Sequence, residues 1–442
     1  MQSRRPDWLQ FSFGNCVRLR YRLPGALATA ILVVGFMVSS AGCAEAAAEA
    51  RWWKGNLHTH TVWSDGGDCP EMVVEWYKKR GYHFLALSDH NILLQGQKWI
   101  HITDKQGGQE TLNMYLERFG DKWVRLRTVE DKVQVCLKPL NEFRCFFEEP
   151  GRFLLIQSEE ITDDKPHVNG INLLEVIPPQ GGDTTVQVLE NNVNAVLAQR
   201  RKTGRMMFAQ INHPNFRWDL RAEDIMQVED AGFFEVFNCH PAVRNYGDEH
   251  HASTERMWDI ILTKRLAELD LPVIYGTATD DAHHYHQWGQ KYANPGRGWV
   301  VVRACHLTPE SIIKAMEAGH FYASTGVVLK DIRFDGKELT VIIKPERAVA
   351  YTTKFIGTLK GYDATSRPVL DANGVEIQTT RIYSDDVGKV LAEVKGTIAR
   401  YTLTGDEIYV RAKVISTRAM DNPSVAGDLQ VAWIQPVVPP DK

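Results

Sequence analysis

Histidine and carboxylate residues gather in short clusters along this chain, and most clusters follow the end of an apolar run. The first is Asn56-Leu57-His58-Thr59-His60, and it is followed by Ser64-Asp65-Gly66 and Ser88-Asp89-His90. The later ones are Glu159-Glu160, His167, Asn212-His213-Pro214 and Asp280-Asp281-Ala282-His283. Because sites of α/β proteins form at the carboxyl ends of strands, side chains spread over more than 200 residues can converge there. The pattern predicts a fold that collects strand ends at one edge.

Apolar runs alternate with helix-like stretches over most of the chain. The runs that predict strands are Phe84 to Leu87, Phe153 to Ile156, Ile171 to Val176, Met206 to Ile211, Phe233 to Phe237, Val273 to Tyr275 and Trp299 to Val302. The stretches that predict helices are Pro70 to Arg80, Val186 to Lys202, Ala252 to Leu269 and Pro309 to Ala318. Such alternation predicts a parallel sheet, either open or closed into a barrel.

Two segments depart from this alternation. Residues 92–151 are mixed in character and rich in Gln, Lys and aromatic residues, and we expect an insertion over the mouth of the site that shapes substrate access. Residues 328–442 contain the hairpin signals Asp335-Gly336 and Asn373-Gly374 between short alternating runs, and they contain no histidine. They predict a separate β-rich domain that carries no metal chemistry.

Composition narrows the class of protein. Apolar residues make up 44% and charged residues 24% of the chain, which is ordinary for a soluble globular protein. Of the 51 basic and 55 acidic side chains, 46 and 52 lie beyond residue 50, so the globular part is mildly acidic. Dedicated nucleic-acid binding usually needs a basic stripe, and we therefore expect none.

The first fifty residues predict an export signal. Arg18, Arg20 and Arg22 precede the apolar run from Ala26 to Val38, and small residues follow. Cleavage after an alanine in residues 44–50 is one interpretation. In another, Ser40-Ala41-Gly42-Cys43 acts as a lipoprotein signal and leaves Cys43 lipidated as a membrane attachment. A third is an uncleaved anchor, although the run falls short of the ~20 residues that span a bilayer. All three predict an exported chain that is periplasmic, lipid-anchored or extracellular.

The cysteines beyond this segment do not form a regular pattern. They are Cys69, Cys136, Cys145, Cys239 and Cys305. An odd number without regular spacing does not predict a disulfide framework, so we expect mostly buried free thiols. A bridge between Cys136 and Cys145 is the alternative.

The clustered residues have the chemistry of a multinuclear metal site. Imidazole and carboxylate ligands together suit zinc, iron or manganese better than calcium or magnesium. A carboxylate can bridge two cations, and a water held between them loses its proton near neutral pH. Phosphate esters suit such a site because negative charge develops on several oxygens at once. Asp89 and Asp280 are expected to orient the imidazoles.

The order His-x-His, Asp-Gly, Ser-Asp-His, Glu, His, His-Pro, Asp-x-His resembles the PHP (polymerase and histidinol phosphatase) family over residues 52–327, apart from the insertion. The resemblance implies a distorted (β/α)7 barrel, followed here by the small all-β domain, with two or three divalent metal ions (Zn, Mn or Fe). It also implies a ligand set of His58, His60, Asp65, His90, Glu160, His167, His213, Asp281 and His283. Glu159 and Asp280 compete for the places of Glu160 and Asp281. His58, His60, Glu160 and Asp281 are the expected catalytic residues.

The resemblance implies an enzyme, a metal-dependent phosphoesterase in which a metal-bound hydroxide attacks a small phosphorylated substrate. Two alternatives stay open at this point. One is a hydrolase like the amidohydrolases that acts on another bond, although no metal-bridging lysine is evident. The other is an envelope or polysaccharide-binding protein with a vestigial barrel. His240 and Arg244 are further candidates for contacts to phosphate, and Glu235 is either a buried paired carboxylate or a functional one.

Overall fold

The structure is a computed structural model, and it describes residues 49–440 of the 442-residue chain. The described residues form one compact unit. The predicted export signal, including Cys43, lies almost entirely outside the described residues. Within the described part, none of the helices combines the length and apolar character needed to cross a membrane.

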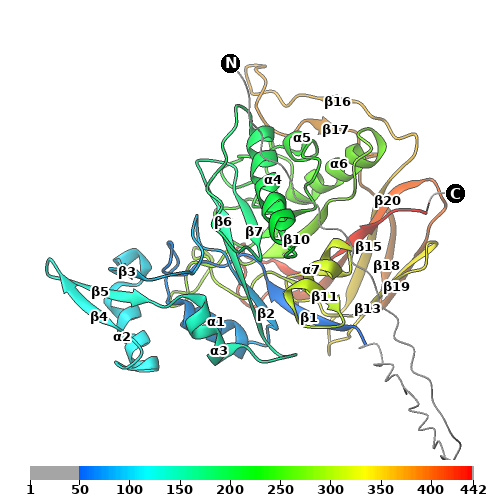
Figure 1. The fold of residues 1–442 in the computed structure, drawn as a ribbon. Coiled ribbons are helices and arrows are strands. Elements are labelled where there is room, and N and C mark those ends of the chain that lie inside the picture. The colour runs from blue at the N-terminus through cyan, green and yellow to red at the C-terminus, as the bar shows by residue number, and fades with distance from the viewer. Residues whose placement is uncertain (1–48, 441–442) are drawn as a thin grey trace, which may run out of the picture. The chain divides into compact units, whose positions relative to one another are not determined.

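Seven strands form the row that carries the site (Figure 1). In spatial order they are β1 (Arg51–Asn56), β2 (Phe84–Leu87), β6 (Leu154–Ile161), β7 (Val168–Ile171), β8 (Phe208–Ile211), β9 (Phe233–Asn238) and β10 (Tyr275–Thr279). The row also closes on itself just beyond its two outer strands. The amide of Asp281 donates to the carbonyl of His58, and the amide of His60 donates to the carbonyl of Ala282, both at 3.1 Å.

The prediction of an all-parallel arrangement is wrong at one strand. β7 runs antiparallel to β6 and to β8, whereas the pairs β1–β2, β2–β6, β8–β9 and β9–β10 are parallel. The predicted strand Ile171 to Val176 is also wrong, because Ile171 is the last residue of β7 and Asn172 adopts a left-handed conformation with φ of 68°. The chain thus turns back directly after β6 instead of crossing over through a helix.

The helices follow the predicted stretches to within two residues at each end. They are α1 (Pro70–Lys79), α4 (Thr185–Thr203), α6 (Thr254–Ala267) and α7 (Pro309–Glu317), with a short α5 (Ala222–Ile225). Side-chain oxygens of Thr184, Ser253 and Thr308 accept the free amides at three of the helix starts. Gly204, with φ of 70°, ends α4 in the left-handed conformation that glycine adopts without strain.

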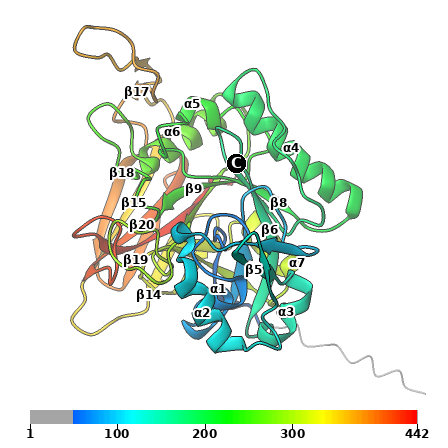
Figure 2. The same ribbon diagram turned by 90° about the vertical axis from the view of Figure 1, so that its left-hand side faces the viewer.

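The predicted insertion has its own small sheet and helices; Figure 1 labels the three strands, and Figure 2 shows α2 and α3 from another side. It contains β3 (Lys98–Ile100), the short 3-10 helix η1 (Asp104–Gln106), α2 (Gly108–Phe119), β4 (Leu126–Val129), β5 (Lys132–Leu137) and α3 (Leu140–Phe147). Residues 103–107 and Glu110 lie at the wall of the cavity described below. This segment therefore reaches the cavity, and its description as an insertion that shapes substrate access stays a prediction.

Antiparallel strands continue the sheet toward the C-terminus. β11 (Trp299–Ala304) pairs with β1, and then follow β12 (Phe321–Ser324), β21 (Leu429–Val437), β20 (Glu407–Ala419), β15 (Tyr351–Leu359) and β18 (Lys389–Lys395). A second sheet holds β13 (Leu329–Phe334), β14 (Glu338–Ile343) and β19 (Ile398–Thr402), and β16 (Ser366–Arg367) pairs with β17 (Ile382–Tyr383). The fold is mixed α/β with one large mixed sheet and C-terminal antiparallel strands. Because β12 pairs with β21, the sheet is continuous across residue 328, and the domain division there stays a prediction.

One buried ion pair joins the helix α6 to these C-terminal strands. The guanidinium of Arg411 on β20 binds both carboxylate oxygens of Asp259 on α6, with N–O distances of 2.7 and 2.6 Å. The hydroxyl of Tyr409 donates to the same carboxylate at 2.8 Å. The Asp259 and Arg411 side chains are only 6% and 2% exposed, and removing Asp259 leaves the buried guanidinium with Glu255, at 3.7 Å, as its remaining carboxylate partner.

We therefore expect Asp259→Ala to lower the free energy of unfolding by about 3–5 kcal/mol. Chemical denaturation of the full chain measures this change. The control is Lys202→Ala, which removes a pair with Glu175 whose side chains are 68% and 65% exposed, and which should change stability by less than about 0.5 kcal/mol. Equal effects of the two substitutions would contradict the role given to Asp259.

Candidate metal centre

The strand ends bring all nine predicted ligand residues together. Four overlapping groups of side chains have their potential ligand atoms within 4.8 Å of one another. These groups are His60, Asp65, His90 and His283; His58, His213 and Asp281; His58, His60 and Glu160; and Glu160, His167 and His213. That each of these residues binds a metal stays a prediction, but their convergence is a property of the fold.

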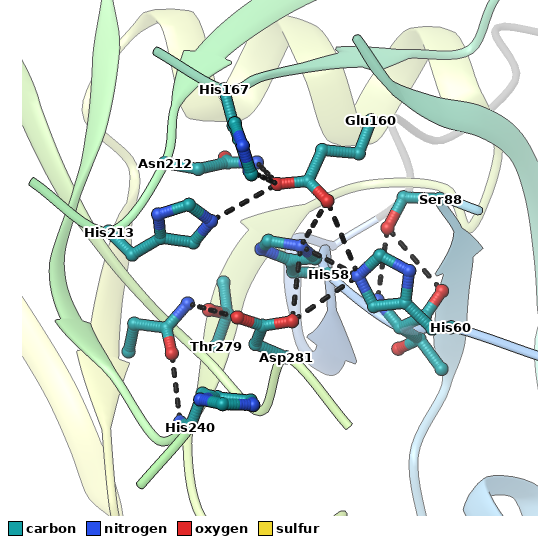
Figure 3. A network of polar contacts seen from close by, with 12 residues as sticks. His58, His60, Ser88, Glu160, His167, Asn212, His213, His240, Thr279 and Asp281 are labelled. Carbon is teal, nitrogen blue, oxygen red and sulfur yellow. Dashed lines mark hydrogen bonds and ion pairs between the residues drawn. The ribbon is translucent and has the colours of Figure 1, made fainter. Parts of the chain in front are cut away.

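Glu160 lies between two sets of imidazoles (Figure 3). Its Oε1 is 3.1 Å from His167 Nδ1 and 3.1 Å from His213 Nε2. Its Oε2 is 2.9 Å from His90 Nδ1, and 3.5 Å from the Nε2 atoms of both histidines that follow β1. One carboxylate that offers its two oxygens to different imidazole groups has the arrangement of a bridging ligand.

Asp281 faces the same center from the opposite side. Its Oδ1 is 3.4 Å from His58 Nε2 and 3.2 Å from His60 Nε2, and those two nitrogens are 3.0 Å apart. Such close nitrogens cannot both carry a proton in this contact. Nearby, His283 Nε2 lies 3.4 Å from Asp65 Oδ1, and the Asp65 side chain is 57% exposed, at the mouth of the site. The donor set therefore fits more than one cation, and such cations would take the place of protons between these atoms.

Local backbone geometry decides between the neighbouring carboxylates. Successive side chains of a strand point to opposite faces, so only one glutamate at the end of β6 can face the center. Glu160 does, whereas Glu159 accepts the amide of Ile177 at 2.6 Å on the other face, where burial raises its pKa to about 7. The sequence left open which glutamate faces the center. The alternation of side chains along β6 places Glu160 there and Glu159 on the other face.

Asp280 and Asp281, which follow β10, also point in different directions. Asp280 turns away and accepts the backbone amides of Gly296, Arg297 and Gly298 at 2.6–2.8 Å, and it is also bonded to Tyr77. Asp281 adopts φ of 47° and points to the imidazoles. Asp280 therefore anchors the loop that follows the site.

The expectation that Asp89 and Asp280 orient imidazoles is wrong. Asp89 accepts the amide and hydroxyl of Thr61 and the amide and hydroxyl of Ser64, so it holds the turn after His60. Burial raises its pKa to about 6. Both aspartates bind backbone and hydroxyl groups because they lie one residue before a ligand and face away from it.

The imidazole of His58 is oriented by Glu235 instead. Glu235 Oε1 lies 2.8 Å from His58 Nδ1 and accepts the hydroxyl of Thr279 at 2.6 Å. Its Oε2 accepts the amide of His213 at 2.7 Å and the side-chain amide of Asn238 at 2.8 Å. The contact to Nδ1 leaves Nε2 free to face the center. Sequence left the role of Glu235 open, because a glutamate within an apolar strand is the only signal.

The electrostatics of the center favour ionised carboxylates. Burial raises the pKa of Glu160, but the positive charges of His58 and His90 outweigh it and hold that pKa well below its usual range. Burial likewise raises the pKa of Asp281, and His58 and His60 reverse the shift. The two buried ionised carboxylates are surrounded by imidazoles and accept one side-chain amide each, from Asn212 and Asn238, which is an environment that divalent cations stabilise.

A cavity of about 980 Å³ opens above the center. Its wall combines ligand residues with residues 103–107 of the insertion, with Phe216, and with residues 284–287 that follow β10. His240 also lines it, and the amide of Ala242 donates to its Nδ1 at 3.1 Å. A neutral imidazole held in this way carries its hydrogen on Nε2. His240, which is not one of the nine predicted ligands, thus offers an N–H donor.

We expect Glu235→Gln to lower metal affinity about 10- to 100-fold, because the amide no longer provides the carboxylate contact to His58. Titration of the metal-stripped full chain with zinc or manganese against a chelating indicator measures the affinity. Glu71→Gln is the matched control, since Glu71 is a buried carboxylate that binds Tyr115 and Trp123 away from the center. Equal affinities in the two variants would show that Glu235 does not support the ligands.

No protein-family profile matches the chain. In sequence it is similar to the DNA polymerase/3'-5' exonuclease PolX of Bacillus subtilis, with 25% identity over 202 residues that cover 42% of this chain and 33% of PolX. The match thus spans about a third of that relative.

Two solved structures are similar to the chain at 14% identity each. One is a two-domain protein of Bacteroides vulgatus that contains a predicted PHP-like metal-dependent phosphoesterase, with a TM-score of 0.35 and coverage of 87% of this chain and 95% of that one. The other is a Bifidobacterium adolescentis protein assigned by inference as a metal-dependent phosphoesterase, with a TM-score of 0.27 and coverage of 53% and 88%. The resemblance inferred from the motifs agrees with what the chain is similar to: part of PolX in sequence, and proteins described as PHP-like or metal-dependent phosphoesterases.

Proposed function

We propose that this chain hydrolyses phosphoester bonds at the centre formed by the nine predicted ligands. The observation that carries the proposal is the position of Glu160, whose two carboxylate oxygens face different groups of imidazoles. A mononuclear site does not need such a bridge. Two or three divalent cations, of zinc, manganese or iron, would be held by the four groups of side chains.

The strand row supports a finer description of the fold. We propose that β1, β2 and β6 to β10 form the distorted (β/α)7 barrel of PHP type. The closing hydrogen bonds between the segments that follow β1 and β10 support this description, and the reversed strand β7 accounts for the distortion. The strands from β13 onward would then be the C-terminal domain.

The chain's own residues perform positioning and substrate binding. When bound, the cations would activate a water and withdraw charge from phosphoryl oxygens. Glu235 fixes the ring of His58, while Asp89 fixes the turn that carries His60. His240 directs an N–H toward the cavity, where a phosphoryl oxygen can accept it.

The cavity favours a small substrate over a polynucleotide. Among the described residues that line it, Lys105 is the one lysine or arginine, and Asp65, Asp104 and Glu110 lie in the same wall. A polyanion would meet little positive charge along its path. We therefore keep a small phosphorylated compound as the proposed substrate. Export, and membrane attachment through Cys43, remain proposals that rest on the sequence of residues 1–50.

The first test compares the full chain with a His58→Ala/His60→Ala variant on p-nitrophenyl phosphate and on its bis-ester. We expect two or three metals per chain by elemental analysis, and a loss of turnover of about 10³-fold or more in the variant, because a ligand pair shared by the metal groups is removed. His306→Ala/His320→Ala is the matched control, since it removes two exposed imidazoles. Bound metals without turnover on either ester would favour hydrolysis of another bond, and a metal-free chain would contradict the proposal.

A second test addresses His240. We expect His240→Phe to lower kcat/KM about 10²-fold at unchanged metal content, because a donor to the developing charge is lost. His240→Gln is the matched variant, since its amide Nε2 can donate from a similar position, and it should recover most of the rate. Equal losses in both variants would assign His240 a packing role only.

A further inference from the structure

A second cavity, of about 430 Å³, lies apart from the metal center and shares no lining residue with the first. Its wall combines Lys54 of β1 and Trp76 of α1 with residues just beyond that helix, and it is completed by the loop after β10 and by the C-terminal strands. Four of the lining residues are aromatic, namely Trp76, Tyr82, Trp288 and Trp299. A volume of this size holds a ligand of one or two rings.

Aromatic rings dominate the wall of this cavity. The rings of Trp76 and Trp288 are nearly parallel, with an interplanar angle of 22° and centroids 6.0 Å apart. Trp288 is 45% exposed, which is unusual for so large an apolar side chain. Gly296 makes the approach possible, because a Cβ at this position, where φ is +85°, would lie 2.8 Å from the Trp76 ring. The absence of a side chain at Gly296 therefore leaves room for the Trp76 ring at the cavity wall.

Two cations at this wall have no carboxylate partner among the described residues. The ammonium of Lys54 lies 3.6 Å from the ring centroid of Trp299 and 3.9 Å from that of Tyr82. The guanidinium of Arg80 lies 4.0 Å from the centroid of Trp76. Burial lowers the pKa of Lys54 to about 8, so it stays largely charged at neutral pH. A half-buried ammonium that is held only by ring faces can accept an anion.

Further polar residues lie beside these cations. Gln430 belongs to the same wall. The indole N–H of Trp76 and the hydroxyl of Tyr82 have no hydrogen-bond partner in the described structure, but both atoms are covered by protein. The cations and the ring faces are therefore the groups that a ligand in this cavity would meet.

We propose that this cavity binds a small organic anion built on one ring, such as an acidic sugar or an aromatic acid. The carboxylate would pair with Lys54, and the ring would pack against Trp288. The aromatic wall alone would also suit a quaternary ammonium ligand. Here, however, Lys54 and Arg80 already occupy ring faces, and Asp421, the one carboxylate of the wall, has a side chain that is 86% exposed. A cationic ligand would meet two like charges, so the charge pattern selects an anion.

Calorimetric titration of the full chain tests the proposal with charge-matched probes. The probes are glucuronate and benzoate, their neutral counterparts glucose and benzyl alcohol, and choline as the cation. We expect at least one anion to bind about tenfold or more tightly than its neutral counterpart, and choline not to bind. Binding of glucuronate alone would identify a sugar site, and binding of benzoate alone a site for aromatic acids.

Two variants separate a binding role from a packing role. Lys54→Met keeps the length of the side chain between the rings and removes its charge, so it should weaken anion binding about tenfold or more. Trp288→Ala removes an exposed ring and should weaken binding without lowering the melting temperature. Metal content should be unchanged in both, which separates this site from the metal center. Anion binding that is equal in the parent and Lys54→Met, or no binding of either anion to the parent chain, would overturn the proposal.

Discussion

The hydrogen bonds between the segments that follow β1 and β10 are the constraint on which the site depends. They join the backbone of His58 and His60 to that of Asp281 and Ala282, more than 220 residues later in the chain. These bonds lie at the carboxyl edge of the row. The backbone pairing alone therefore places the two imidazoles close to the carboxylate of Asp281. The remaining predicted ligands lie at or next to the strand ends of the same row, so the closed row determines their distances as well.

Concentrating so many ionisable groups has an energetic cost, and the surrounding residues show how it is offset. Glu235, Asp89 and Asp280 are each buried, and each is saturated by hydrogen bonds from amides and hydroxyls. They hold backbone turns or a ring in place, while the inward carboxylates, Glu160 and Asp281, meet almost only imidazoles. Rigid positioning and an excess of ligand atoms are what a multinuclear centre requires.

The loop after β10 is the structural link between the two cavities. Its first part, residues 284–287, lines the metal cavity, whereas Trp288, Pro295 and Gly296 line the second one. Arg297 is 1% exposed and donates to the carbonyls of Gly289 and Asn422, which ties this loop to the C-terminal strands. Asp280 anchors the same loop through three amides. A ligand in the second cavity would therefore touch a loop whose other end borders the proposed active site.

Local patterns in the sequence determined the helices, several strands and the residue types of the site. The helices α1, α4, α6 and α7 are predictable because each continues over nine or more residues, and three of them begin at a Ser or Thr that caps the first turn. Strands as short as β7 carry too little pattern, and their direction depends on pairing partners far along the chain, so the antiparallel turn of β7 was missed. That reversal matters, because it brings His167, which precedes β7, to the same edge as residues that follow the parallel strands.

The motifs identified which histidines and acids belong together, because such spacings are rare by chance. Only the tertiary structure decided between Glu159 and Glu160 and between Asp280 and Asp281, since that choice depends on which face of a strand end meets the center. It alone revealed the role of Glu235 and the aromatic cavity at Lys54, which are assembled from segments that no local pattern connects. Sequence thus determined the chemistry available to this protein, and long-range backbone pairing decided which side chains share a site.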